Sequence, residues 1–444
     1  MKDKKFYMMA LSLGIPSMLQ LLAKQFANLV DNIMIGGLNV YAIAGVSIIN
    51  QLHFIFGLTL FGMASTASIF TPQYKATNNE KKITEVFLIS LLFMTPIGII
   101  FFTILKLQPM LILQLFTADI QTLYYAKIYL DYIAYAFLLF PISLSISFAF
   151  RFTGHLKMVM YFAFINVGLS VFLNFGLIHG NMGFPAMGVA GAGLGTLIAR
   201  IIECLVFIIA TIVIKSPIKI KIAQFFKLDV ELIKQYISKG IGLVFNEFAL
   251  AVGLQTLVVI YSRRMSTNIA ALSIAMTFLN LMHVGFSGMN VMIKLIVGEH
   301  LGRNDFTQAK IDAKRLRKLS IIIGISMGII IFIIGNLIMF TYNVEQAVIT
   351  DARLLLLTMV GVGWLTYLNA SYYFTFAAGG DTRSILIIDS LYIWLLSIPI
   401  AFLLSRGNIL LPVHYLLVQM LNFIRLYISK HLDKKQRWIK NITV

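Results

Sequence analysis

Apolar stretches of about 20 residues recur along the whole chain, and they constrain its fold more than any other sequence feature. A helix of that length crosses the ~30 Å hydrocarbon core of a bilayer. Lipid cannot satisfy backbone amide and carbonyl groups, so such a span must be a closed helix. Charged residues make up only 12% of the chain, against about 25% in soluble domains. The sequence therefore predicts an all-α polytopic protein whose solvent is the lipid bilayer.

We expect twelve membrane spans. They cover residues 9–36, 43–70, 86–105, 122–147, 158–178, 189–214, 240–262, 268–297, 319–341, 352–376, 385–404 and 409–429. Because twelve is an even number, both termini should face the same side of the membrane.

The distribution of basic residues indicates which side that is. With the N-terminus inside, 27 of the 36 Lys and Arg residues fall in cytoplasmic segments and five fall outside. This is a strong positive-inside bias, and it predicts a multi-pass plasma-membrane protein with both termini in the cytoplasm. The same bias explains the net charge of +18 without a nucleic-acid partner.

The chain repeats its landmarks at an offset of about 226 residues. The matched segments are 14–16 with 240–242, 76–82 with 303–310, and 151–155 with 377–383. We therefore expect two pseudo-symmetric six-helix bundles, residues 1–214 and 240–444, the second ending in a basic cytoplasmic tail. A charged cytoplasmic linker, residues 215–239, would join them. Parallel repeats of this kind are typical of transporters that hold substrate between two halves.

Several classes of protein lack support in the sequence. There is no phosphate-binding loop of the Walker type, no His/Cys cluster with metal-ligand spacing, and no extramembrane segment long enough for a catalytic domain. We therefore expect no enzymatic activity and no cofactor. The prediction is a monomeric transporter of a small organic substrate, driven by an ion gradient.

Ionisable residues inside spans are costly and mark candidate functional sites. Asp31 is the clearest in the first span. A carboxyl group taken out of water holds its proton more readily, so Asp31 could load and release a proton; its oxygens could instead bind sodium. Lys24 lies two helical turns away on the same face, with Asn28 between them. Lys24 is expected to pair with Asp31 or to join a relay, and the alternative is a direct contact with substrate.

Other buried charges are candidates of lower rank. Glu247 in span 7 is the acid of the second half that best corresponds to Asp31, and it is a second candidate for sodium. Arg200 and Glu203 are spaced i, i+3 and are expected to pair with each other. Lys294 is placed to snorkel toward the inner interface. Asp389 in span 11 is a candidate relay member.

Several motifs, in their order and spacing, resemble the multidrug and toxic compound extrusion (MATE) family of antiporters. These are the Gly-x-Pro opening of span 1 with Val30–Gly36, the segments 42–46, 174–178 and 183–196, and the loops at 297–305 and 380–382. The resemblance covers the whole chain. It implies export of drugs or other organic molecules in exchange for protons or sodium by alternating access. It also implies ion-coupling roles for Asp31, Asn174, Thr196 and Glu247.

The chain departs from the family pattern in ways that bear on the substrate. Thr366 stands where one branch of the family has an aspartate in span 10, with Asn369 one turn on. Ser170 stands where Asn is common. Lys24 replaces a neutral amide and Lys294 a small residue. Lys24, Asn28, Ser170 and Asn369 are our candidate cavity residues, and the added cations permit a zwitterionic or anionic substrate.

Two alternatives remain open. A lipid-linked saccharide flippase can share this architecture, but it is expected to carry several basic residues for a pyrophosphate. A membrane-embedded transferase needs clustered polar catalytic groups, whereas the seven histidines here are scattered along the chain.

Overall fold

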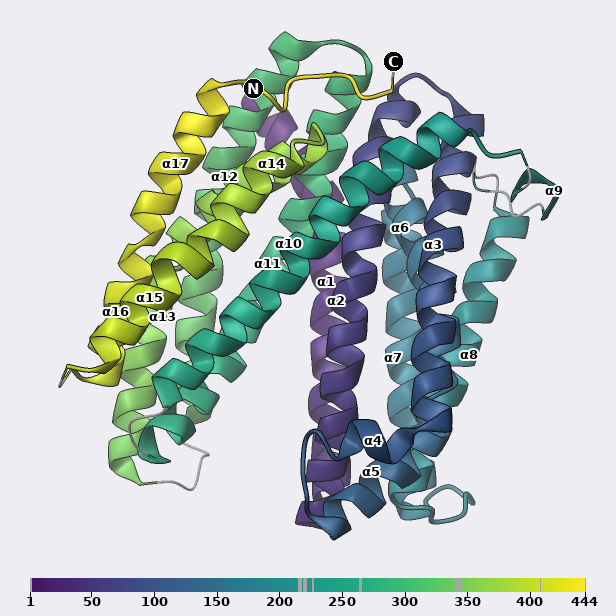
Figure 1. The fold of residues 1–444 in the computed structure, drawn as a ribbon, viewed down its shortest axis with the longest axis vertical. Coiled ribbons are helices and arrows are strands. Elements are labelled where there is room, and N and C mark those ends of the chain that lie inside the picture. Colours follow the sequence, from purple (N-terminus) through teal and green to yellow (C-terminus); the bar gives the residue numbers. More distant parts are fainter. Residues whose placement is uncertain are drawn as a thin grey trace. The chain divides into compact units, whose positions relative to one another are not determined.

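The computed structural model is built from helices (Figure 1). It describes residues 2–214, 218, 222–225, 227–262, 266–339, 345–407 and 409–443. The first eight helices are α1 Lys2–Gly36, α2 Val40–Ala76, α3 Glu80–Leu107, α4 Pro109–Leu113, α5 Ile120–Ile133, α6 Ala136–Thr153, α7 Leu156–His179 and α8 Val189–Val213. The others are α9 Ile222–Phe225, α10 Val230–Ser262, α11 Ser266–Gly302, α12 Phe306–Met339, α13 Gln346–Ala378, α14 Thr382–Leu386, α15 Ile398–Ser405, α16 Leu411–Met420 and α17 Asn422–Lys434, with π-helical segments Ile387–Leu391 and Ile393–Ser397 between α14 and α15.

Within the described residues, twelve helical segments are long and apolar enough to cross a membrane. The predicted number of spans is therefore confirmed, and one boundary is wrong. The predicted span 122–147 is divided into α5 and α6, and only α6 qualifies as a span. Helix α5 has only 14 residues, and its Lys127 and Asp131 form an exposed ion pair of 2.8 Å. Two half-exposed charges belong in water or at the interface rather than in hydrocarbon.

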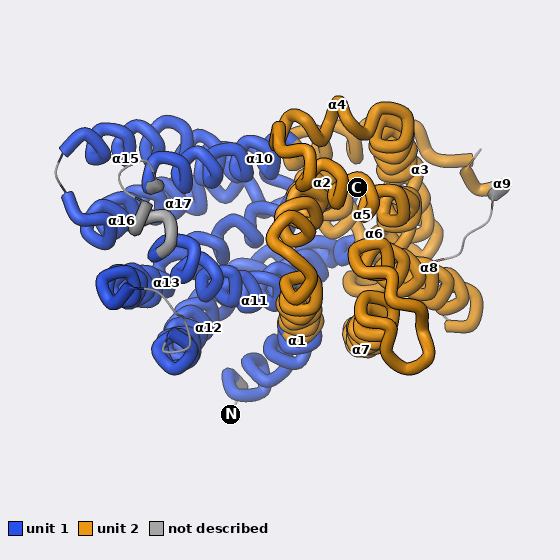
Figure 2. The backbone as a smooth tube through the Cα atoms, turned by 90° about the horizontal axis from the view of Figure 1, so that it is seen from below, with its two compact units in different colours: residues 1–18, 72–78, 245–444 blue, residues 19–71, 79–244 orange. Residues whose placement is uncertain are grey.

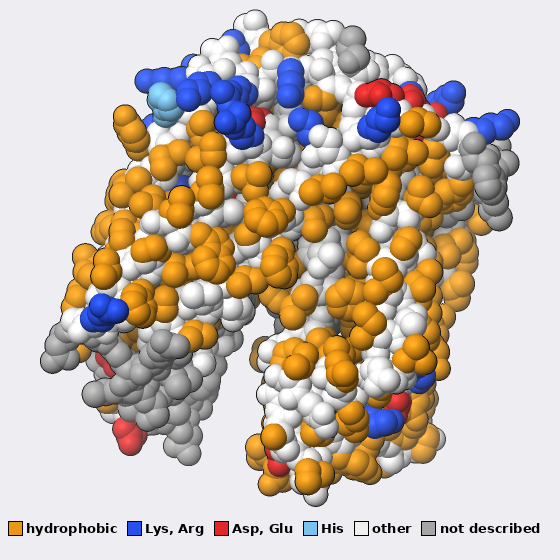
Figure 3. All heavy atoms as spheres, in the orientation of Figure 1, with side chains coloured by type: hydrophobic (Ala, Val, Ile, Leu, Met, Phe, Trp, Pro, Cys, Tyr) orange, Lys and Arg blue, Asp and Glu red, His pale blue; other side chains and the backbone are white. Residues whose placement is uncertain are grey.

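Hydrophobic side chains also cover much of the outer surface of the described chain (Figure 3). Ile33, Ile212 and Phe245 are each at least 60% exposed, and many other large apolar side chains are exposed as well. A water-soluble monomer rarely exposes contiguous apolar surface of this extent. Together with the twelve candidate spans, this surface shows a multi-pass membrane protein.

The chain forms two compact units (Figure 2). Unit 1 contains residues 1–18, 72–78 and 245–444, and unit 2 contains residues 19–71 and 79–244. Helices α1, α2 and α10 therefore each contribute residues to both units. The proposed linker 215–239 lies partly outside the described residues, as do Arg263 and Arg264 of the charge distribution.

The internal repeat is visible in the backbone at two pairs of turns. Asn78 and Asn304, 226 residues apart, both have positive φ, 54° and 59°. Gly154 and Gly380, at the same offset, also have positive φ, 109° and 67°. Asn and Gly tolerate this left-handed conformation better than other residues. The residue types that matched in the sequence thus make equivalent turns after corresponding helices.

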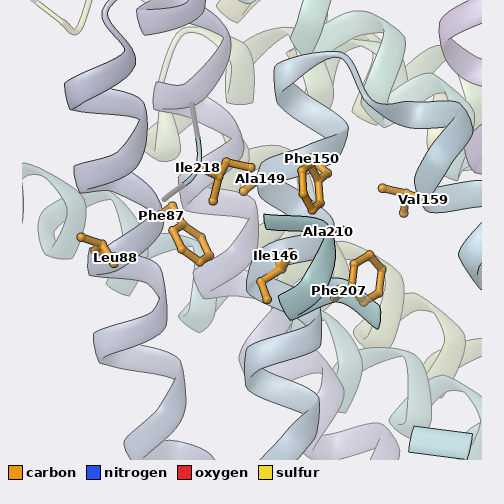
Figure 4. Packing of buried hydrophobic residues seen from close by; sticks show 9 residues of the cluster. All are labelled: Phe87, Leu88, Ile146, Ala149, Phe150, Val159, Phe207, Ala210 and Ile218. Atoms are coloured by element: carbon orange, nitrogen blue, oxygen red, sulfur yellow. The ribbon is translucent and has the colours of Figure 1, made fainter. Parts of the chain in front are cut away.

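In unit 2 a hydrophobic core holds α3, α6, α7 and α8 together (Figure 4). Phe87, Phe150 and Phe207 come from three of these helices, and each is at most 2% exposed. The core also receives Ile218 from the segment that follows α8. Buried aromatic rings of this size hold the frame that positions the polar groups described below.

In unit 1 the C-terminal tail packs back onto helix ends. Trp438 is 2% exposed, and its indole nitrogen donates to Asp433, which also receives a bidentate pair from Arg317 at 2.6 and 2.9 Å. The Ile442 amide donates to the Gln73 side chain at 2.9 Å. The basic tail is therefore an ordered part of unit 1.

Candidate functional site

Unit 2 contains a cavity of about 140 Å³ that reaches the acid of the first span. Helices α1, α2, α5, α6, α7 and α8 all contribute to it. It is lined by Asn28, Asp31, Ile35, Val46, Ile49, Asn50, His53, Tyr129, Ile133, Ala136, Asn174, Ala192, Thr196 and Arg200. The same cavity is thus lined by three predicted ion-coupling residues, Asp31, Asn174 and Thr196. It is also lined by one predicted cavity residue, Asn28.

Asp31 is held by a neutral partner. The side-chain amide of Asn174 donates to the carboxylate at 2.8 Å, and Asn174 is only 1% exposed. The other atom of that amide, Oδ1, has no hydrogen-bond partner. Asn174 can therefore orient the carboxylate without neutralising its charge.

Gly195 makes room for this arrangement. A Cβ atom at Gly195 would lie 2.3 Å from Asn174 Oδ1, and a Cβ at Gly191 would lie 2.2 Å from the Leu177 carbonyl oxygen. Helices α7 and α8 therefore approach closely along these glycines, as expected for small residues at helix interfaces in lipid. Gly195 links this packing directly to the orientation of Asn174.

We expect Gly195→Ala to lower the transport rate about tenfold, because Asn174 must turn away and one hydrogen bond to a charged group is lost. The rate should be measured in proteoliposomes at equal protein content. Gly168→Ala on α7 is the matched control, since no atom lies within 4 Å of its new Cβ. Equal rates for the two variants would show that the position of Asn174 does not matter.

Several residues that line the cavity were missed at the sequence level, among them two polar residues of α2. Asn50 and His53 line the cavity from α2, together with Val46 and Ile49. These four positions follow the i, i+3, i+4, i+7 spacing of one helix face. The signal that could have found them was the pair of polar residues, three apart, on one face of an otherwise apolar span.

The predicted pair between Lys24 and Asp31 is not formed. The ammonium of Lys24 instead lies in electrostatic range of Glu203, Arg200 and Arg151. The Arg200–Glu203 pair itself is confirmed, with a distance of 2.5 Å. Seven residues separate Lys24 from Asp31, about 10 Å along the helix, and the two side chains reach different neighbours.

Helix α1 therefore carries a polar stripe with opposite charges at its two ends. Gln20, Lys24, Asn28 and Asp31 share one face of the helix. Gln20 accepts a hydrogen bond of 2.6 Å from Arg151 on α6. The stripe runs from a cationic region around Lys24 to an anionic group at Asp31.

Ser170 lies on α7, half-buried, and is not among the residues that line the cavity. It sits one helical turn from Asn174. The structure gives it a position near the site but no polar contact with it.

Glu247, an acid of unit 1, has a different environment from Asp31. Its carboxylate accepts a 2.8 Å hydrogen bond from the Tyr373 hydroxyl, and the ammonium of Lys294 acts on it electrostatically. Lys294 is 1% exposed. The prediction that Lys294 snorkels to the interface is therefore wrong, because the side chain is turned inward toward an acid.

A second buried network surrounds Asp389 in unit 1. Arg425 forms an ion pair with this carboxylate, and the Asn246 amide donates to it at 3.4 Å. Ser390 donates to Asn246 at 2.8 Å. Asp389 lies in a π-helical segment, a local widening that is frequent at functional sites.

Asn369 lies in unit 1 rather than on the cavity of unit 2. It is fully buried, and its amide donates to the Asn422 carbonyl at 3.1 Å. This contact joins α13 to α17 and gives Asn369 a packing role. Among the described residues, no cluster of three His, Cys, Asp or Glu side chains has the geometry of a metal site.

The chain is similar to known proteins along most of its length. A model of the MatE family matches residues 16–175 and 243–403. The chain is 23% identical to the probable multidrug resistance protein YoeA of Bacillus subtilis over 397 residues, 88% of this chain and 85% of that protein. It is 21% identical to the probable multidrug resistance protein NorM of Thermotoga maritima, over 89% of this chain and 85% of the relative.

Solved structures share the fold. An outward-facing multidrug resistance MATE transporter of the MOP superfamily superposes with a TM-score of 0.86 at 16% identity, covering 96% of both chains. A MOP superfamily transporter from Pyrococcus furiosus, described as having a binding pocket of reverse polarity, superposes with a TM-score of 0.83 at 16% identity over 95% of both chains. The all-α fold predicted from the sequence is confirmed.

Proposed function

Because this chain belongs to the MatE family of transporters, we propose that it is a secondary active antiporter that exports small organic molecules. The coupling cation, a proton or sodium, binds at Asp31. The halves 1–214 and 240–444, joined by the linker, alternate access to substrate. The transporter works as a monomer, without a cofactor and without covalent chemistry.

The observation that carries this proposal is the difference between the partners of the membrane-embedded acids. Asp31 faces a cavity and is bound by a neutral amide. Glu203 and Asp389 are paired with arginines, and Glu247 faces Lys294. A carboxylate that is already paired with an arginine or lysine gains less from binding another cation. Asp31 is therefore the acid best placed to bind a cation that comes and goes.

Tyr129 and Arg200 also face the cavity, from α5 and α8. The Arg200 charge is shared with Glu203, which leaves the cavity near Asp31 polar but not strongly positive. Asn28, Asn50 and Thr196 add oxygen atoms on the same lining. These oxygens are the type of ligand that sodium prefers, so both cations fit the site.

Efflux of a fluorescent organic cation from vesicles tests the function. Proteoliposomes are given a pH gradient in one arm and a sodium gradient in the other. Uphill efflux in one arm identifies the coupling cation. If the dye only equilibrates across the membrane, and neither gradient drives its accumulation, the antiport proposal is contradicted.

The orientation in the plasma membrane is a separate prediction. Cysteines placed at Asn39 and Asn181 should react with an impermeant thiol reagent in intact cells, whereas a cysteine at Asn79 should react only after permeabilisation. The reason is the positive-inside bias of the loops. The native Cys204 is 3% exposed, so the unsubstituted protein is the background control. Labelling of Asn79→Cys in intact cells would contradict the predicted topology.

One observation favours the flippase alternative. Lys24, Arg151 and Arg200 bring three cations together in unit 2, a charge suited to a pyrophosphate. Translocation of a fluorescent lipid-linked pyrophosphate saccharide, without any ion gradient, would support that function. Gradient-driven dye efflux without such translocation would support the antiporter.

A further inference from the structure

Helix α12 of unit 1 carries an exposed stripe that changes from apolar to basic along its length. The stripe contains Ile325, Ile322, Lys318 and Lys314, which are spaced three or four residues apart and therefore share one face of the helix. Ile325 is 48% exposed and Ile322 is 57% exposed. In a protein with many membrane spans, exposed apolar side chains of a span face lipid. The two lysines thus continue a lipid-facing stripe at the point where it stops being apolar.

Helix α17 carries a stripe of the same kind. Phe423, Tyr427, Lys430 and Lys434 follow one another at intervals of four, three and four residues, and all four side chains are exposed. Tyr427 is 74% exposed, and exposed tyrosine is typical of the membrane interface, where the ring lies at the level of the lipid headgroups. The lysines that follow it therefore begin at headgroup level.

An ion pair joins the two helices where both stripes become basic. The Arg317 guanidinium on α12 donates to both carboxylate oxygens of Asp433 on α17, at 2.6 and 2.9 Å. It also lies over the ring of Tyr372 at 4.1 Å. The next residues in the chain are Lys318 and Lys434, and Lys and Arg side chains gather around this end of α17 (Figure 3). The pair therefore brings the basic ends of the two stripes alongside each other.

The acids of this region are engaged by arginines and not by the four lysines. Asp433 is held by Arg317, and Arg315 binds both Asp312 and Asp3. Within the described ranges, none of the four lysines forms an ion pair. Their charges are therefore available to an anion that does not come from these parts of the chain.

We propose that this surface of α12 and α17 binds an anionic phospholipid, whose phosphate lies among the four lysines and whose acyl chains lie along the two apolar stripes. Basic clusters directly beyond a membrane helix attract anionic headgroups. The apolar half of each stripe favours a lipid over a free phosphate, because a free phosphate would contact only the lysines. The surface belongs to unit 1, whereas the cavity that reaches Asp31 belongs to unit 2.

Two lipids with the same acyl chains and different headgroups make the test. Dioleoyl phosphatidylglycerol is anionic, and dioleoyl phosphatidylcholine is zwitterionic. Native mass spectrometry of the purified full chain in detergent measures the apparent Kd of the first lipid bound. The wild type should bind phosphatidylglycerol more tightly than phosphatidylcholine, and excess inorganic phosphate should not displace the lipid.

The double variant Lys430→Gln with Lys434→Gln should weaken binding of phosphatidylglycerol about 30-fold and leave phosphatidylcholine unchanged. Lys430→Arg with Lys434→Arg keeps both charges and should bind phosphatidylglycerol like the wild type. The matched control is Lys157→Gln with Lys227→Gln, which removes the same charge from two exposed positions of unit 2. This control should retain the affinity of the wild type.

Three results would overturn the proposal. Equal affinity of the wild type for the two lipids would show that the surface does not select an anionic headgroup. Equal weakening in the unit 2 control would show a general attraction of charge to lipid and no defined site. Complete displacement of phosphatidylglycerol by inorganic phosphate would show an anion site in which the apolar stripes have no part.

Discussion

Asp31→Asn is expected to abolish uphill export while substrate binding persists. The variant keeps the volume of the side chain and an oxygen that can accept the Asn174 hydrogen bond, now 2.8 Å long. It removes the negative charge that exchanges one cation for another. We expect the accumulation ratio of dye across the vesicle membrane to fall to about 1, because energy in the gradient is no longer coupled to substrate. Anisotropy in detergent measures the residual binding.

The matched control is Asp131→Asn in the same unit. Asp131 is exposed and pairs with Lys127 at the end of an i, i+4 step, an interaction of small energetic weight. This variant should transport like the wild type. Near-normal uphill transport by Asp31→Asn would remove Asp31 from the coupling mechanism.

Glu247→Gln tests whether a sodium-coupled mechanism uses an acid in each half of the chain. Sodium binding needs several oxygen ligands, so a sodium-coupled mechanism that uses both halves should fail in this variant too. The pairing of Glu247 with Lys294 and Tyr373 leads us to expect retained uphill transport. A defect confined to Asp31→Asn then indicates a single cation site in unit 2, and the two gradients of the efflux experiment identify its cation.

The sequence predicted spans and contacts correctly where the residues concerned belong to one helix. The apolar runs predicted the spans, and the i, i+3 spacing predicted the Arg200–Glu203 pair. The matched segments 76–82 and 303–310 contain equivalent turns at Asn78 and Asn304. In these cases the interacting groups lie within one turn or one span, so spacing along the chain determines the contact.

Contacts between helices could not be predicted in the same way. Lys24 and Asp31 share a face of α1, yet each finds its partner on another helix, Asn174 on α7 for the acid and the charges of α6 and α8 for the lysine. Lys294 was expected to reach the interface but turns toward Glu247. Choosing among several potential partners requires knowledge of which helices are neighbours, and spacing within one helix does not supply it.

The buried pair of Arg425 and Asp389 gives the second large effect. Arg425→Met should lower the free energy of unfolding by about 3–5 kcal/mol, because it leaves the Asp389 carboxylate uncompensated inside the protein. Asp389 is 4% exposed, so water offers little compensation. Denaturant titration of the purified protein in detergent measures the loss. Arg383→Met, at an exposed position in unit 1, should stay within about 0.5 kcal/mol of the wild type.

The double variant Arg425→Met with Asp389→Asn removes both charges and keeps an acceptor for the Asn246 amide, which donates to Asp389. It should recover most of the lost stability, since replacing both members of a buried ion pair costs far less than removing one. Equal instability of the single and double variants would show that packing, rather than charge, is responsible. If the double variant is stable but cannot transport, the pair takes part in the transport cycle, because restored stability rules out a folding defect. If it is stable and transports normally, the π-helical segment around Asp389 serves only to seat a structural ion pair.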